Sequence, residues 1–144
     1  MQNRSILLVE DSQDDEALTK RAFHKARVKN EVVVARDGAE ALEYLFCTGK
    51  YATRSTSDLP QVVLLDLHLP KVDGIEVLRR IRADERTRLL PVIILTSSRE
   101  EKDLLRGYEG GANSYIVKPI DAEQFDESIQ QLGMYWLLLN EAMP

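Results

Sequence analysis

The chain has 144 residues, a formal net charge of −5 and 44% hydrophobic residues. This length is typical of one domain with a hydrophobic core of its own. The mild acidic surplus argues against a general nucleic-acid-binding surface, which would be basic. No apolar run approaches the roughly 20 residues that span a bilayer, and no signal peptide precedes the first strand-like run. Cys47 has no partner for an internal disulfide, so we expect a cytoplasmic protein.

Five short apolar runs predict β-strands that are buried on both faces. Each run is rich in leucine or β-branched residues, as is typical of a parallel sheet covered by helices. The runs are Ser5–Val9, Glu31–Ala35, Gln61–Asp66, Pro91–Thr96 and Ser114–Val117.

A helix-start signal lies after each of these runs. In each signal, a Ser or Asp side chain can accept from the backbone N–H three residues later, where an acidic or amide side chain stands. The pairs are Ser12 with Asp15, Asp37 with Glu40, Asp73 with Glu76, Ser98 with Glu101, and Asp121 with Gln124. The repeated order of strand and helix predicts a single α/β domain, a (βα)5 unit whose parallel five-stranded sheet carries helices on both faces.

Two segments depart from a minimal unit of this kind. Thr48–Leu59 is a long polar connection, which we predict to be a mobile loop. The last helix is expected to be extended, from Ala122 to about Glu141, whereas the fourth helix is expected to be short. One face of the last helix has apolar residues at heptad spacing: Phe125, Ile129, Leu132, Trp136, Leu139 and Met143.

Polar side chains stand at the carboxyl ends of four of the five predicted strands. They are Glu10 and Asp11, Asp66, Thr96 and Lys118. Ligands of open parallel sheets bind outside this edge, so we expect these side chains to meet in one pocket. The strand that ends at Ala35 has no such side chain and would lie outside the pocket.

The residue types in this set suit a magnesium-dependent phosphoryl acceptor. Glu10, Asp11 and Asp66 supply the oxygen ligands that Mg²⁺ prefers. An aspartate such as Asp66 is a recognised phosphoryl acceptor. Four donors would contact the phosphoryl oxygens: the ammonium of Lys118, the hydroxyl of Thr96, and the backbone amides of Leu67 and Ser97.

Each of these residues also has a simpler structural interpretation. Asp11 can cap a helix, Asp66 can open a turn and Lys118 can be a solvated lysine. The Lys118–Pro119 bond can be cis or trans, and the sequence does not separate the two states. The joint pattern at four strand ends is what favours a shared site. The arginine-rich residues 79–88 are interpreted as a solvated face with local ion pairs.

These motifs resemble the receiver domain of bacterial two-component response regulators, the CheY-like family. The matching segments are residues 8–12 (LVEDS), 64–70 (LLDLHLP) with 73–74 (DG), 95–98 (LTSS) and 111–119 (GANSYIVKP). The resemblance covers about residues 5 to 130 of what we take to be one receiver domain over residues 1–144. It implies the sheet order 2-1-3-4-5.

The resemblance implies that Asp66 receives a phosphoryl group from the phosphohistidine of a partner histidine kinase. Mg²⁺, or Mn²⁺ in its place, would contact Asp11, Asp66 and the backbone carbonyl of His68, and Glu10 would reach it through water. Such a protein signals and is not an enzyme, beyond assisting its own phosphorylation and dephosphorylation. With no DNA-binding segment, output is expected through protein contact or phosphorelay.

The family also implies a conformational switch. Thr96 and Tyr115 would form the switch pair, in which the hydroxyl turns toward the phosphoryl group and the ring moves inward. Glu10 stands where many members have Asp, which puts its metal contact in question. His68 and Ser98 flank the path of the hydrolytic water in the family, so their identity should tune the lifetime of the phosphoryl group.

The chain is similar in particular to the small regulators that are paired with bacterial phytochromes. The shared features are the loop at residues 49–51 (GKY), residues 67–71 (LHLPK) and the final helix with Trp136. This likeness implies a phytochrome kinase as partner and a homodimer formed through the last strands and helix. The expected dimer contacts are Phe125, Ile129, Leu132, Trp136 and Leu139, and packing of the helix end within its own chain is the alternative.

Three other interpretations share the fold or the aspartate. A haloacid-dehalogenase-type phosphatase needs a second aspartate two residues after the first, where His68 stands. A flavin-binding module needs Ser or Thr and free amides after the first strand, where Glu10 and Asp11 stand. A receiver-like dimerisation or interaction module that works without phosphorylation is the serious alternative, and the complete acceptor set disfavours it.

Overall fold

The computed structural model describes residues 4–55, 57–97 and 111–134. Within them, five parallel strands form one sheet in the order β2-β1-β3-β4-β5. The strands are β1 (Ile6–Val9), β2 (Val32–Ala35), β3 (Val62–Asp66), β4 (Val92–Thr96) and β5 (Ser114–Val117). The predicted α/β class and the order implied by the family resemblance are confirmed. Among the described residues, none of the helices has the length and apolarity to cross a bilayer.

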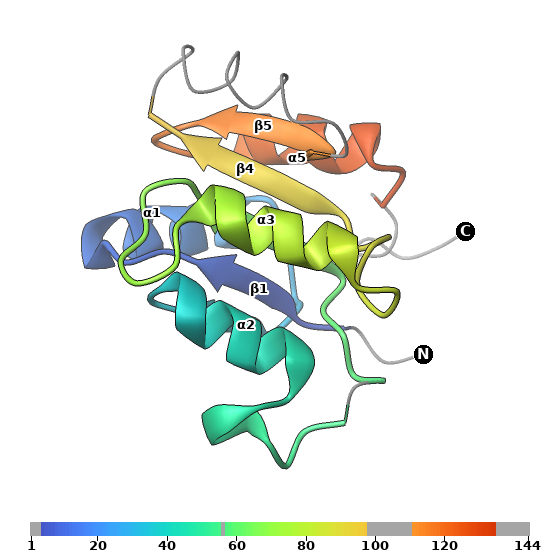
Figure 1. Ribbon diagram of the computed structural model, residues 1–144. Helices are drawn as coiled ribbons and strands as arrows, with labels where there is room; N and C mark the ends of the chain where they lie inside the picture. Colours follow the sequence, from blue (N-terminus) through green and yellow to red (C-terminus); the bar gives the residue numbers. More distant parts are fainter. Residues whose placement is uncertain (1–3, 56, 98–110, 135–144) are drawn as a thin grey trace.

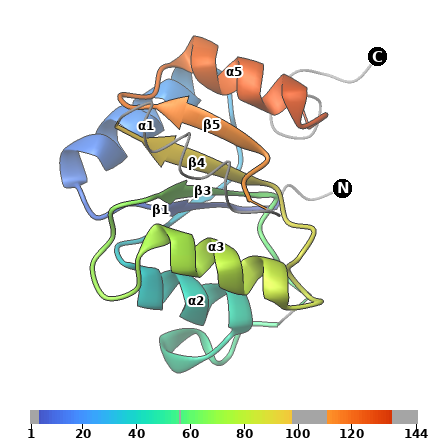
Figure 2. The ribbon, with the colours of Figure 1, turned by 45° about the horizontal axis from the view of Figure 1, so that its top comes forward.

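Helices cover both faces of the sheet (Figures 1 and 2). The elements α1 (Gln13–Lys25) and α5 (Ala122–Gln131) lie on one face, and α2 (Gly38–Phe46) and α3 (Gly74–Ala83) lie on the other. Successive strand side chains alternate between two cores, so that Leu7 packs on the α2 and α3 side and Leu8 on the α1 and α5 side. Because helices cover both faces of the sheet, the strand sequences are continuous apolar runs and do not alternate between apolar and polar residues.

The strand register brings the carboxyl ends of the strands to one edge of the sheet. Val9 of β1 pairs with Leu65 of β3, and Thr96 of β4 pairs with Val117 of β5. The residues that follow β1 and β5, and the last residues of β3 and β4, therefore leave the sheet side by side. This is the edge at which the sequence predicts a pocket.

Side-chain caps begin the helices where the sequence predicts them. The hydroxyl oxygen of Ser12 accepts from the backbone N–H of Asp15 at 3.2 Å. An aspartate makes the same contact at the start of each of the other three described α-helices: Asp37, Asp73 and Asp121. The fifth predicted start, at Ser98, and the short helix that would follow it lie outside the described residues.

The polar connection before β3 packs against α2. Gly49–Tyr51 form a short 3-10 helix, η1, and the ring of Tyr51 meets the ring of Tyr44 edge-on with centroids 5.0 Å apart. The guanidinium of Arg54 lies 3.6 Å from the centroid of Tyr44 and donates to the backbone carbonyl of the same residue. The prediction of a mobile loop over Thr48–Leu59 therefore missed the contacts that hold this segment on α2.

The last described helix, α5, ends at Gln131, so the predicted continuous helix to about Glu141 is wrong. Gly133 has a φ of 72°, in the left-handed region. Its N–H donates to the carbonyl of Gln130 at 3.0 Å, and the N–H of Met134 donates to the carbonyl of Ile129 at 3.1 Å. This pair of hydrogen bonds is the common way in which a glycine ends a helix.

The residues predicted for dimer contacts fall into different environments. Phe125 and Ile129 are fully buried within their own chain, and the ring centroid of Phe125 lies 4.5 Å from that of Phe23 in α1. Packing within the chain accounts for these two side chains, so we remove them from the dimer contacts. Leu132 is half-buried at the end of α5. The other two predicted contacts, Trp136 and Leu139, lie outside the described residues.

Candidate functional site

Three carboxylates lie together beyond the carboxyl ends of β1 and β3. One carboxylate oxygen from each of Glu10, Asp11 and Asp66 lies within 4.8 Å of the other two. Glu10 is completely buried and Asp66 is 5% exposed, whereas Asp11 is exposed to solvent. The structure thus brings together the three acidic side chains that the sequence predicts for a metal site.

Backbone hydrogen bonds fix two of these carboxylates. The N–H of Glu10 donates to the carbonyl of Ala35 at the end of β2, at 2.9 Å, so Glu10 continues the line of the sheet. Its carboxylate accepts from the N–H of Ser12 at 3.3 Å. At the end of β3, the carboxylate of Asp66 accepts from the N–H of His68 at 3.2 Å. Both side chains are therefore held at the sheet edge by the turns that follow their strands.

Lys118 reaches these carboxylates from the end of β5. Its Nζ lies 2.8 Å from Oδ2 of Asp66, 2.9 Å from Oε1 of Glu10 and 2.9 Å from Oδ2 of Asp15. The lysine side chain is 17% exposed. The Lys118–Pro119 peptide bond, for which the sequence left both states open, is cis.

The contact with Asp15 is one that sequence reasoning missed. Asp15 figured there only as the second member of a helix-start pair. A signal was available, since Asp15 stands in the first turn of the helix that begins directly after Glu10 and Asp11. A carboxylate in that position faces the same edge of the sheet as the predicted site.

Burial and charge shift the protonation equilibria of the site. Loss of hydration raises the pKa of Glu10 to about 7, the neighbouring Asp66 carboxylate adds to the rise, and Lys118 opposes it. For Lys118, burial lowers the pKa, but hydrogen bonds to Asp66, Glu10 and Asp15 outweigh this effect and raise the pKa above its ordinary value. Lys118 is therefore charged at neutral pH, and it is one cation among several carboxylates.

The donor set fits a hard divalent cation. Mg²⁺ prefers oxygen ligands and is usually bound by one or two carboxylates together with water and phosphate oxygens. Glu10, Asp11 and Asp66 offer carboxylate oxygens at the required closeness. Burial, the first cause of the raised pKa of Glu10, and the nearby Asp66 carboxylate both disfavour its charged form, which a divalent ion would favour.

The two predicted switch residues lie on neighbouring strands, where Thr96 is at the carboxyl end of β4 and Tyr115 pairs with Ile94, two residues before that end. Thr96 is the last residue of β4 and is 1% exposed, and its backbone carbonyl accepts from the N–H of Lys118 at 2.8 Å. Tyr115 lies in β5 and packs half-buried against the core on the α2 and α3 side. Thr96 therefore contacts Lys118 across the sheet, and Tyr115 precedes Lys118 by three residues in the same segment.

The loop after β3 depends on a close approach that only glycine permits. The N–H of Gly74 donates to the carbonyl of Leu67 at 3.0 Å. A Cβ atom at position 74 would lie 2.4 Å from the carbonyl oxygen of Asp66 and 2.8 Å from the Cα of Leu67. Leu67 is buried, and His68 and Ser97 are exposed just beyond their strands. The backbone amides of Leu67 and Ser97 and the backbone carbonyl of His68 thus lie at the same edge as the acidic cluster.

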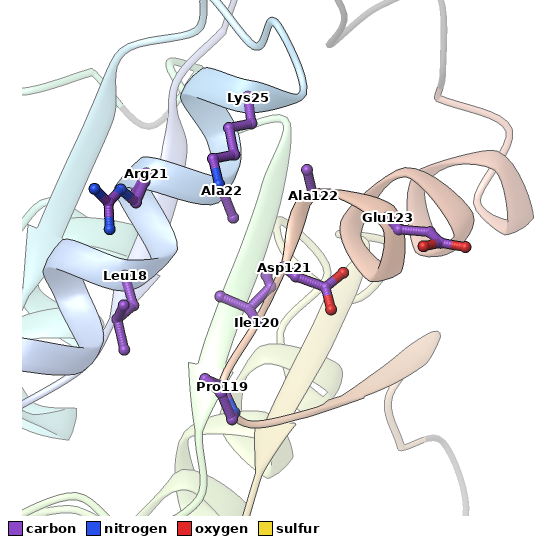
Figure 3. A pocket seen from close by; sticks show the side chains of 9 residues that line it. All are labelled: Leu18, Arg21, Ala22, Lys25, Pro119, Ile120, Asp121, Ala122 and Glu123. Atoms are coloured by element: carbon purple, nitrogen blue, oxygen red, sulfur yellow. The ribbon is translucent and has the colours of Figure 1, made fainter.

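A groove runs beside this edge between α1 and the segment that follows β5 (Figure 3). Leu18 and Ile120 come from opposite walls of the groove, and Pro119, the residue after Lys118, stands at one end. The groove has a volume of about 480 Å³, and Leu18 is 41% exposed. Its lining residues are Leu18, Arg21, Ala22, Lys25, Pro119, Ile120, Asp121, Ala122 and Glu123. The sequence analysis did not predict this groove, because its walls are far apart along the chain.

The chain matches the response regulator receiver domain over residues 6–130 and belongs to this family of two-component signalling proteins. Receiver domains bind Mg²⁺ or Mn²⁺ at an acidic pocket and pair with histidine kinases. The fold and the acidic cluster described above agree with this membership. The predicted family is thereby confirmed.

Regulators associated with phytochromes are among its close homologues. The bacteriophytochrome response regulator AtBRR, whose structure has been solved, is 55% identical to this chain in sequence. The two structures superpose with a TM-score of 0.89 over 98% of this chain and 100% of that chain. The Mn²⁺-bound form of response regulator Rcp1 is 33% identical, with a TM-score of 0.74 over 98% and 99% of the two chains. The phosphorylated cyanobacterial phytochrome response regulator RcpA is 38% identical, with a TM-score of 0.75 over 94% and 95%.

Curated relatives include proteins from a cyanobacterium and a methanogen. Response regulator Rcp1 of Synechocystis is 36% identical over 92% of this chain and 88% of its own length. The probable methanogenesis regulatory protein FilR2 of Methanothrix harundinacea is 41% identical over 95% of this chain and 86% of its own length. The predicted likeness to phytochrome regulators is confirmed.

The raised pKa of Glu10 predicts a pH effect on stability in the absence of divalent ions. Because the folded-state pKa of about 7 lies above the ordinary 4.5, the folded state binds more protons between these values. The stability that Glu10 contributes is therefore present below pH ~4.5 and is lost as the pH rises through about 7. Urea unfolding in EDTA should show this loss in the wild type and not in Glu10→Gln.

Glu16→Gln is the matched control. Its hydrogen bond with Lys20 outweighs burial and lowers the pKa of Glu16, so this carboxylate contributes stability above its ordinary pKa that is lost on acidification. The two substitutions should change the pH profile in opposite senses. Parallel profiles for the wild type and Glu10→Gln would contradict the prediction.

Proposed function

We propose that this protein is a response regulator in which Asp66 accepts a phosphoryl group from a histidine kinase. The observation that carries the proposal is the setting of the Asp66 carboxylate, which lies beside those of Glu10 and Asp11 and 2.8 Å from the ammonium of Lys118. Membership of the receiver family supports it, as does the likeness to a regulator solved in a phosphorylated form.

The proposed chemistry is a single phosphoryl transfer. An oxygen of the Asp66 carboxylate attacks the phosphorus of the kinase phosphohistidine, a P–O bond forms, and the P–N bond breaks as the imidazole leaves with the electron pair. Lys118 then donates to a phosphoryl oxygen and offsets part of its charge. Further donors to the phosphoryl oxygens are the Thr96 hydroxyl and the backbone amides of Leu67 and Ser97.

Four residues would hold the Mg²⁺ or Mn²⁺ ion. They are Glu10, Asp11, Asp66 and His68, the last through its backbone carbonyl. When bound, the ion offsets the negative charge that accumulates as phosphoryl oxygens approach the carboxylates. The close packing at Gly74 fixes the turn that carries the Asp66 and His68 groups.

The switch in this proposal connects the site to the surface. The hydroxyl of Thr96 turns toward the new phosphoryl group, and the half-buried ring of Tyr115 moves inward on the adjacent strand. A local change of charge thereby selects between two packings of the edge of the sheet. The switched surface signals through protein contact or phosphorelay.

The kinase docks, in this proposal, at the groove between α1 and residues 119–123 (Figure 3). Docking must bring the phosphohistidine to Asp66, and this groove ends at Pro119, directly after Lys118. Leu18, Ala22 and Ile120 suit the apolar face of a helix, while Arg21 and Lys25 suit acidic residues around it. A phytochrome kinase is the partner that the homologues named above favour.

The first prediction tests acceptance of the phosphoryl group. Purified wild type incubated with Mg²⁺ and acetyl phosphate should gain the mass of one phosphoryl group, which is labile in base. Asp66→Asn, which removes the nucleophilic oxygen, should gain none, and EDTA should suppress labelling of the wild type. Unchanged wild-type mass would favour the interaction module that works without phosphorylation.

A second prediction tests the docking groove. Leu18→Glu should slow phosphotransfer from a bacteriophytochrome kinase by about ten-fold or more, because a buried apolar contact contributes on the order of 1 kcal/mol or more to such interfaces. Labelling by acetyl phosphate should be unchanged. The control is Leu89→Glu, since Leu89 is also exposed, at 82%, but lies before β4 at the opposite edge of the sheet. Equal slowing by both variants would place the docking site elsewhere.

We also propose that the chain forms a homodimer through its last strand and the residues from Leu132 onward. Sedimentation of the wild type should show association that depends on protein concentration. Leu132→Glu should weaken this association because it places a charge on an apolar contact. Gln130→Glu, at an exposed position of α5, is the control. Monomers alone at high concentration, with and without acetyl phosphate, would contradict the proposal.

A further inference from the structure

Lys118 uses every hydrogen atom of its ammonium group within the site. Nζ donates to Oδ2 of Asp66 at 2.8 Å, to Oδ2 of Asp15 at 2.9 Å and to Oε2 of Glu10 at 3.2 Å. A lysine ammonium has three N–H donors and no acceptor. A phosphoryl oxygen can therefore receive a hydrogen bond from Lys118 only after one of these contacts is released or shared.

Asp15 differs from the other two acceptors in position. Its side chain is 33% exposed, whereas those of Asp66 and Glu10 are 6% and 0% exposed. It belongs to the first turn of α1, where its backbone N–H donates to the hydroxyl of Ser12 at 3.2 Å. Asp15 is thus the acceptor at the solvent side of the ammonium group, fixed to a helix and not to the sheet.

The proposed reaction gives Asp66 and Glu10 roles as acceptor and metal ligand and leaves Asp15 without one. We infer that Asp15 is a positioning residue that holds Lys118 away from the incoming phosphoryl group and so limits the rate at which Asp66 is phosphorylated. This inference rests on the proposed function. It concerns the regulation of that site and adds no step to the transfer.

Two physical effects act in the same direction. The Asp15 carboxylate competes for one of the three Lys118 donors, and charge-assisted hydrogen bonds of this kind are the strong ones. It also adds a negative charge where an anionic phosphodonor approaches from solvent, which repels the donor. Removal of the charge should therefore leave Lys118 more available and the approach more favourable.

The test compares two neighbouring acids with acetyl phosphate as the donor. Asp15→Asn keeps the shape of the side chain and removes its charge. Asp14→Asn removes a charge from the adjacent, exposed position. Intact mass against time should give a rate constant about two- to five-fold higher than wild type for Asp15→Asn, the size expected from one partly exposed ion pair. Asp14→Asn should remain close to wild type, and the difference should shrink in 1 M salt.

A second measurement reports on the contact without phosphorylation. The ¹⁵Nζ resonance of Lys118 in the unphosphorylated protein should shift in Asp15→Asn and stay in place in Asp14→Asn. Asp15→Ala removes both the charge and the hydrogen-bond acceptor, so it should also accelerate labelling. It replaces Asp15→Asn in the test if that variant folds poorly.

The outcomes separate this inference from the proposed function. Labelling of the wild type with no acceleration in Asp15→Asn, or with equal acceleration in Asp14→Asn, would overturn the inference and leave the proposed function intact. Absence of labelling in the wild type would overturn the proposed function and, with it, the rate effect of Asp15. The Lys118 resonance would then still show whether the Asp15 contact exists in solution.

Discussion

The site depends on one electrostatic constraint, the placement of a single ammonium group among carboxylates that are largely removed from water. Glu10 and Asp66 sit at adjacent strand ends with side chains that are 0% and 6% exposed, and their mutual repulsion is balanced in part by Lys118. Loss of hydration and the neighbouring Asp66 carboxylate still raise the pKa of Glu10, even with Lys118 in contact. A divalent ion would offset the charge of these carboxylates. In the proposed function, that ion and Lys118 together supply the positive charge that a phosphoryl group on Asp66 requires.

The sheet provides the rigidity that this balance requires. Strands β1, β3 and β5 deliver Glu10, Asp66 and Lys118 to one edge, and helices on both faces hold the strands in register. Small residues set the spacing of the loops around the site. At Gly38, at the start of α2, a Cβ atom would lie 1.8 Å from the carbonyl oxygen of Val72, so the loop after β3 rests directly on that helix. The loop after β3 is therefore connected by close contact to the start of α2, which follows β2 at the same end of the sheet.

Much of the fold and site was predictable from the sequence, because polar residues stand at the carboxyl ends of four of the five strands and a side-chain cap begins each of the four described α-helices. The incorrect predictions concern sequence patterns that two different structures can produce. An apolar stripe at heptad spacing looks the same whether it faces a partner or its own sheet, and Phe125 proved to face the sheet. Because the apolar spacing continues past Gln131, the sequence analysis did not predict the end of α5, where Gly133 has a positive φ. Asp15 was missed because it stands in the first turn of α1, whereas the predicted site was assembled from the residues at strand ends.

Helix α1 makes contacts on three of its faces, and these contacts limit which of its residues can change in evolution. Asp15 touches the lysine of the site, Phe23 fills the core, and Leu18 lines the groove that we propose for docking. If the kinase docks as proposed, a duplicate of this gene could acquire a different kinase through the outward positions of α1, such as Arg21, or through residues 119–123, while the inward positions of α1 stayed unchanged. Insulation between parallel signalling pathways would then be encoded in few side chains.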